Sequence, residues 1–69
     1  MENKRIKKLE QLMDERREFA LETDKQMGNE TGCFLPNNPD YIYYKGVLDA
    51  VYTMGYEYSV ENGKHIIYT

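Results

Sequence analysis

The sequence has little of the chemistry on which enzymes, metal proteins and disulfide-stapled proteins depend. Its 69 residues include one cysteine, one histidine and no tryptophan. One thiol cannot form an internal disulfide, and a lone Cys and a lone His with scattered carboxylates give no metal-ligand spacing. A nucleophile needs a base beside it, yet Cys33 and His65 are far apart in the chain. We therefore expect no enzyme, no metal and no cofactor, and we interpret His65 as a packed or rim histidine rather than a base.

Long apolar runs are also missing. No stretch approaches the roughly 20 residues that span a bilayer, and the N-terminal part is charged throughout, unlike a signal peptide. The single cysteine suits a reducing compartment. These features together predict a cytoplasmic protein that does not contact membranes.

Positive charge is scarce after Gly28, where Lys45 and Lys64 are the only lysines or arginines. The net charge is −3 and the pI is about 5.0. Four basic residues crowd the N-terminus: Lys4, Arg5, Lys7 and Lys8. An acidic chain argues against a dedicated nucleic-acid binder, so nucleic acid is not the expected partner. An accessory factor that binds nucleic acid through this basic tip is the alternative function.

The length of the chain limits its stability as a monomer. A single domain over residues 1–69 buries only about 60% of its unfolded surface. Domains of this size without disulfides or metals are often marginal and gain stability from association. We therefore expect a homodimer.

The clearest element is a helix over residues 39–54. Asn38 is a good N-cap, Pro39 suits the first helical position, and Gly55 provides the left-handed residue that ends a helix. Apolar residues at helical spacing share one face: Tyr44, Val47, Leu48, Val51 and Met54. This face predicts a core contact.

A longer helix is predicted over residues 2–27, which contain no Gly or Pro and lead to Gly28. Its apolar stripe comprises Ile6, Leu9, Leu12, Met13, Ala20 and Met27, with Phe19 at the edge. Arg16 and Thr23 interrupt this stripe. Two interpretations follow: the helix packs on the helix over 39–54, or it overhangs and pairs with a second copy.

Another face of the long helix carries one carboxylate every four residues. This acidic ridge consists of Glu10, Asp14, Glu18 and Glu22. Neighbouring carboxylates at this spacing repel one another by about 0.2–0.5 kcal/mol. The ridge is either a solvated face or an electrostatic surface for a basic partner.

The segment between the helices, residues 28–38, is rich in Gly, Pro and Asn and predicts a loop. Its apolar centre is Cys33, Phe34 and Leu35. We expect these three residues to tuck beneath the loop as a plug, which makes Cys33 a buried thiol; a reactive thiol is the alternative.

Residues 56–68 predict a β-hairpin, because Asn62-Gly63 is a preferred two-residue turn between strand formers. The turn places Glu61 opposite Lys64 and so sets the register of both strands. The face expected to lie on the helices carries Tyr56, Tyr58, Val60, His65 and Ile67. The opposite face carries Glu57, Ser59, Glu61, Lys64, Ile66 and Tyr68.

Tyrosine is abundant, with seven residues in all and six of them between Tyr41 and Tyr58. Tyrosine combines apolar area with a hydroxyl, so it suits either the rim of a core or an interface. On the second hairpin face, Ile66 and Tyr68 are more apolar than solvent requires. The expected apolar anchors for a protein partner are Tyr41, Tyr43, Tyr52, Ile66 and Tyr68, with the acidic ridge as an electrostatic surface.

The stretch YYKGVLDAVYTMGYEYSVENGKHIIY combines a helix, a glycine and a hairpin that closes with G-K-H. It resembles small, acidic, tyrosine-rich proteins of bacteriophages and mobile elements in low-GC Gram-positive bacteria. The resemblance covers about the last thirty residues and carries over no functional residue. It implies a protein that binds a host or partner protein.

These elements predict an α+β fold in the order helix, loop, helix, β-hairpin (ααββ), with the hairpin packed on the helices. For function, the sequence predicts a small non-enzymatic protein-interaction module.

Overall fold

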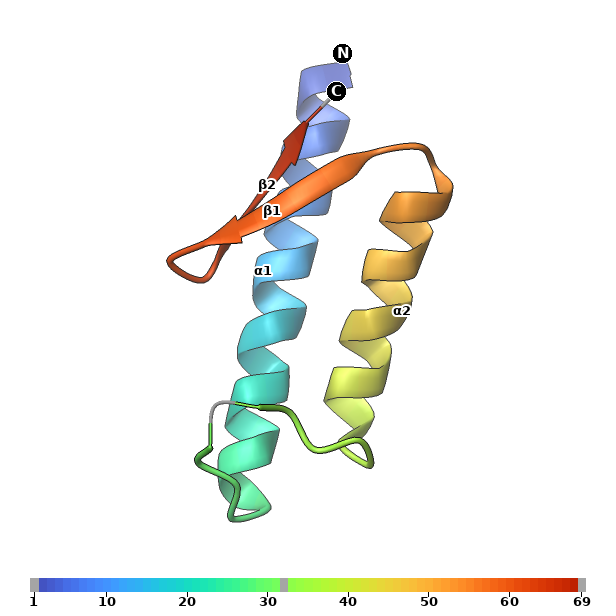
Figure 1. Ribbon diagram of the computed structural model, residues 1–69. Coiled ribbons are helices and arrows are strands. Elements are labelled where there is room, and N and C mark those ends of the chain that lie inside the picture. Colours follow the sequence, from blue (N-terminus) through green and yellow to red (C-terminus); the bar gives the residue numbers. More distant parts are fainter. Residues whose placement is uncertain (1, 32, 69) are drawn as a thin grey trace.

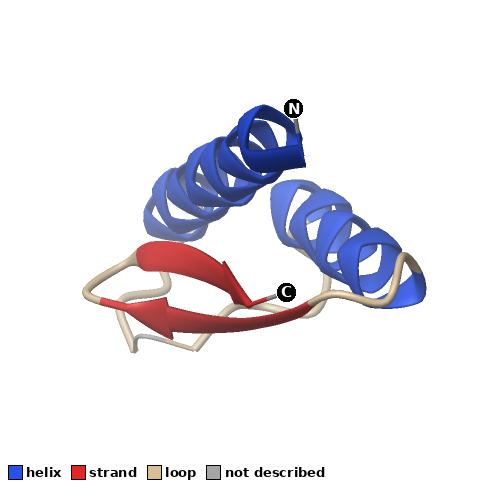
Figure 2. Cartoon of the chain, turned by 90° about the horizontal axis from the view of Figure 1, so that it is seen from above, coloured by secondary structure: helices blue, strands red, loops and turns tan. Residues whose placement is uncertain are grey.

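The computed structural model describes residues 2–31 and 33–68. Its elements are α1 Glu2–Gln26, α2 Pro39–Thr53, β1 Glu57–Glu61 and β2 Lys64–Tyr68. The helices run side by side in opposite directions, and the hairpin crosses one face of the pair (Figure 1). Figure 2 shows the two resulting layers, helices in one and hairpin in the other. The predicted α+β fold of ααββ order is confirmed, and no helix in the described residues is long and apolar enough to cross a membrane.

α2 begins and ends where its flanking residues predict. The Asn38 side-chain carbonyl accepts hydrogen bonds from two backbone N–H groups in the first turn, at 2.9 and 3.2 Å. At the other end Gly55 takes a φ of 90°, and the Tyr56 N–H donates to the Val51 carbonyl at 3.3 Å. This arrangement satisfies a terminal carbonyl of the helix and turns the chain toward the hairpin.

A buried polar cluster holds the C-terminal half of α1 against the start of α2. The Asn38 amide donates to the Ala20 carbonyl at 2.9 Å and to the Asp24 carboxylate at 2.6 Å. Asn29 donates to the other Asp24 oxygen at 2.9 Å. Burial alone would raise the pKa of Asp24, but these hydrogen bonds and one from the Leu35 N–H outweigh it and lower the pKa. The N-cap of α2 is therefore also its tie to α1.

The core is small and lies where the hairpin meets both helices. Met13 of α1, Val51 of α2 and Ile67 of β2 form its centre. Partly buried apolar residues surround them: Ile6, Leu9, Val47, Leu48, Tyr56 and Tyr58. The predicted stripes are confirmed at these positions. Met27 and Met54 are exposed instead, and each directly follows the last residue of its helix.

An aromatic stack, rather than a buried thiol, anchors the loop between the helices. Phe34 stacks on Tyr41 with the ring centroids 4.7 Å apart, and Leu35 is half-buried. Cys33 is exposed, so the prediction of a buried thiol is wrong. The Asn29 amide holds the Cys33 carbonyl at 2.5 Å, and only the two residues after Cys33 form the plug.

The hairpin has the predicted turn and register. Asn62 and Gly63 take positive φ values of 53° and 78°, and Val60 lies opposite His65. His65 and Ile67 are buried, as predicted for the face that meets the helices. Val60 is exposed, because β2 rather than β1 is the strand that packs against α1.

Candidate functional site

Carboxylates of α1 close the outer edge of β2. The His65 N–H donates to Asp14 at 2.7 Å, and the Ile67 N–H donates to Glu10 at 2.8 Å. Four helical residues advance about 6 Å and two strand residues advance about 6.8 Å, so carboxylates one turn apart match alternate strand amides. Two members of the acidic ridge thus serve the chain's own sheet, a role that the spacing alone did not reveal.

A chain of hydrogen bonds joins α1, β2 and α2. Asp14 Oδ1 lies 2.7 Å from His65 Nδ1, and His65 Nε2 lies 2.7 Å from the Tyr44 hydroxyl. An acid, an imidazole and a hydroxyl in this order also occur at nucleophilic active sites. Here the His65 side chain is 0% exposed, which separates the imidazole from any substrate in solution. The geometry therefore suits a structural clamp, and the prediction of a packed His65 is confirmed.

The electrostatics of this clamp favour a charged Asp14 and a neutral Tyr44. Burial would raise the pKa of Asp14, but the hydrogen bonds from His65 and the nearby charge of Lys64 outweigh it and lower the pKa. Burial raises the pKa of the Tyr44 hydroxyl, and the charge of Arg17 opposes this only in part. At neutral pH, Asp14 thus accepts hydrogen bonds and Tyr44 keeps its proton.

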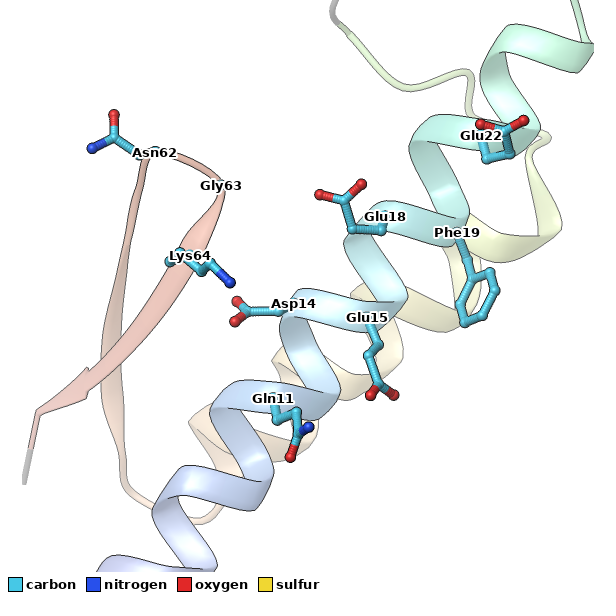
Figure 3. A pocket seen from close by; sticks show the side chains of 9 residues that line it. All are labelled: Gln11, Asp14, Glu15, Glu18, Phe19, Glu22, Asn62, Gly63 and Lys64. Carbon is cyan, nitrogen blue, oxygen red and sulfur yellow. The ribbon is translucent and has the colours of Figure 1, made fainter.

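An open hollow of about 870 Å³ lies between α1 and the turn of the hairpin (Figure 3). Its lining is Gln11, Asp14, Glu15, Glu18, Phe19, Glu22, Asn62, Gly63 and Lys64. Lys64 points toward Asp14 across the gap, whereas Glu15 and Phe19 project from the other side of α1. Four of the nine lining residues are acidic and one is a lysine, so the net charge of the lining suits a cationic group. Among the described residues, however, no three His, Cys, Asp or Glu side chains are placed to hold a metal ion.

The predicted aromatic anchors do not form one patch. Tyr43 and Tyr52 are both exposed, but nine positions along a helix amount to a half-turn, so they lie on opposite sides of α2. Tyr41 is half-buried in the loop stack. Ile66 and Tyr68 belong to the hairpin face turned away from the helices. The anchors therefore occupy four separate places: two sides of α2, the loop stack and the outer face of the hairpin.

The side of the helix pair turned away from the hairpin carries a further apolar surface. This outer helix face includes Leu12, Arg16, Phe19, Tyr43, Val47 and Ala50. Val47 lies at its inner border, since it also packs against the core. The Arg16 guanidinium lies 4.2 Å from the Tyr43 ring centre and 5.6 Å from the Phe19 ring centre, so it bridges the two helices. The sequence signal for this surface was Arg16 itself, which interrupted the apolar stripe.

β1 keeps an open edge. Glu61 and Lys64 flank the turn as a hydrogen-bonded pair, so the backbone N–H and C=O groups of Tyr58 and Val60 point away from β2. On β2, by contrast, the outward N–H groups of His65 and Ile67 donate to carboxylates of α1. Within residues 2–31 and 33–68, no third strand pairs with β1. The sheet thus has one closed edge and one open edge.

The fold and these surfaces define a two-layer α+β protein of ααββ order. Comparison with protein-family models, with curated proteins and with solved structures gives no match for this chain. Its function therefore has to follow from its own surfaces.

Proposed function

We propose that this protein is a small, non-enzymatic interaction module that adds an extended segment of a partner protein to the open edge of β1. The main support is the difference between the two edges of the sheet, one of which is closed and the other open. Glu10 and Asp14 occupy the edge of β2, whereas Tyr58 and Val60 turn their backbone groups to the open edge. Such edges pair readily with another strand. The resemblance to phage and mobile-element proteins makes a host protein the natural partner.

Side chains along the hairpin indicate the chemistry of this partner segment. Glu57 and Glu61 are exposed at the two ends of β1, so an added strand gains from Lys or Arg at positions opposite them. On the same face, the Tyr68 hydroxyl lies 2.9 Å from the Ser59 hydroxyl and the Tyr68 ring is exposed beside the half-buried Ile66. The expected segment is extended, basic and interspersed with apolar residues.

The test uses two variants at one position. Val60→Pro removes the outward N–H without removing a hydrogen bond of the hairpin, whereas Val60→Ala removes side-chain atoms and keeps that N–H. A partner captured from host lysate by the wild-type chain should also be captured by Val60→Ala and be lost with Val60→Pro. Hydrogen exchange should show slower exchange of the Tyr58 and Val60 amides in the complex. A partner that binds both variants equally, or leaves these amides unprotected, contradicts the proposal.

The alternative is binding of nucleic acid at the basic tip. Its support is a shallow hollow near the N-terminus of α1 that is lined by Lys4, Arg5, Lys8, Leu9 and Leu12. Phosphate contacts of this kind weaken steeply with salt. Retention on a polyanion column beyond about 0.2 M salt would favour this function over the first, and the double variant Lys4→Glu, Lys8→Glu should then abolish retention.

A further inference from the structure

The chain exposes more surface than its size predicts. Its accessible area is 5224 Å², whereas the scaling for folded monomers gives about 4,500 Å² at 8.2 kDa. The surplus of about 700 Å² is close to the roughly 800 Å² that each partner buries in a standard protein interface. Part of this surplus comes from the extended shape, 41 Å along its longest axis. The outer helix face contributes Phe19 and Tyr43, which are 54% and 53% exposed.

The outer helix face has both the ridges and the grooves that helix packing requires. On α2, a shallow hollow is lined by Tyr43, Gly46, Val47 and Ala50. Small residues between larger ones leave a groove that accepts side chains of another helix. On α1, Phe19 is exposed and Leu12 is partly exposed beside it on the same side. Ridges and grooves are thus both present on one face.

The charge of α1 reverses along its length. Lys4 and Lys8 lie in the first turns, and Glu15, Glu18 and Glu22 follow in the second half; all five side chains are exposed. Among the described residues, the one close contact between a carboxylate and a basic side chain joins Asp14 and His65, so none of these five charged side chains is paired there. A helix that is basic at one end and acidic at the other attracts a second copy running in the opposite direction. It repels a copy running parallel.

We propose that a second copy of this chain covers the outer helix face, with the two α1 helices antiparallel across a two-fold axis. Along the helix axis, Lys4 and Lys8 of one copy then lie level with Glu22 and Glu18 of the other, because both pairs are centred on position 13. Glu18 flanks the interface on the side of the hairpin turn. Leu12 lies nearest the two-fold axis, and Phe19 adds exposed apolar area on either side of it. A two-fold contact of this kind closes on itself and forms a dimer rather than a filament. The hairpins stay outside, so this inference stands separately from the partner site on β1.

Absolute mass in solution, measured by light scattering or sedimentation across a wide concentration range, tests the inference. The wild-type chain should have twice the 8.2 kDa mass of one copy. Lys4→Glu with Lys8→Glu should raise the dimer dissociation constant about tenfold or more, and so should Glu18→Lys with Glu22→Lys. All four substitutions together should bring the constant back to within about threefold of wild type. An equimolar mixture of the two double variants should form a heterodimer.

Three single variants complete the test. Phe19→Asp should give a monomer whose circular dichroism is unchanged, since Phe19 is exposed in the monomer. Tyr68→Asp and Val60→Pro, on the hairpin, should keep the wild-type mass, which separates this inference from the function proposed for β1. A wild-type chain that stays monomeric overturns the inference. A dimer that is insensitive to the charge reversals and to Phe19→Asp overturns it equally.

Discussion

Asp14 fixes the hairpin to α1 through one carboxylate oxygen, which accepts a hydrogen bond from the His65 backbone N–H and lies 2.7 Å from the His65 ring Nδ1. Asp14→Ala leaves these buried groups without an acceptor, and we expect a loss of about 1.5–3 kcal/mol in unfolding free energy. Asp49 is an exposed aspartate on α2, and Asp49→Ala should change stability by less than about 0.5 kcal/mol. Urea unfolding at one protein concentration measures both variants. Equal losses would show that the contact with His65 adds no stability.

Low pH should lower the free energy of unfolding, because it protonates Asp14 and Asp24. Burial alone would raise the pKa values of Asp14 and Asp24, but their hydrogen bonds lower both pKa values below the ordinary 3.8. As the pH falls, the unfolded chain binds protons before the folded chain does. The stabilisation is therefore complete well above pH 3.8 and is lost as the pH falls through the lower, folded-state values. The urea midpoint followed from neutral to strongly acidic pH should decline, and Asp24→Asn should decline less steeply. If the urea midpoint of Asp24→Asn declined as steeply with falling pH as that of the wild type, Asp24 would not contribute to the loss of stability in acid.

Two glycines in different elements should respond in opposite ways to the same substitution. Gly63 has a φ of 78° in the hairpin turn, and a Cβ there would lie 3.3 Å from the Arg17 side chain. Gly63→Ala should cost about 1–2 kcal/mol, because an L-residue is strained in the left-handed region. Gly46 lies inside α2, where a Cβ meets no atom within 4 Å. Gly46→Ala should stabilise the monomer by about 0.5–1 kcal/mol. Thermal unfolding of dilute samples distinguishes the two, and a shift in the same direction for both would contradict this account.

The elements that sequence predicts well are those with local signals. Asn38 and Gly55 mark the ends of α2, and Asn62-Gly63 sets the register of the hairpin, because caps and turns depend on adjacent residues. The contact between Asp14 and His65 joins residues 51 positions apart, and no local pattern encodes it. The acidic ridge was visible as a periodicity, but the strand edge that two of its members serve was not. For the same reason the exposure of Cys33, which depends on how the loop folds back, was mispredicted.

At the scale of the whole molecule, a core centred on Met13, Val51 and Ile67 has to stabilise a chain of 69 residues. The clamp between the layers and the polar cluster around Asp24 add specific contacts, but they add little buried apolar area. Association through the outer helix face would supply that area from outside the chain. The stability of the fold and the dimer would then be linked.

This linkage gives a prediction for the intact protein. When a folded dimer unfolds to separate chains, the unfolding temperature rises with protein concentration. For two chains of this length, a tenfold increase in concentration should raise the unfolding temperature by about 5 °C. The double variant Lys4→Glu, Lys8→Glu should unfold at a temperature that depends little on concentration at values where it is monomeric. The variant with all four charges exchanged should regain the dependence, since it restores every opposite-charge pair. A wild-type unfolding temperature that stays constant across concentrations would mean that the small core stabilises the monomer unaided, and that the outer helix face remains in contact with solvent.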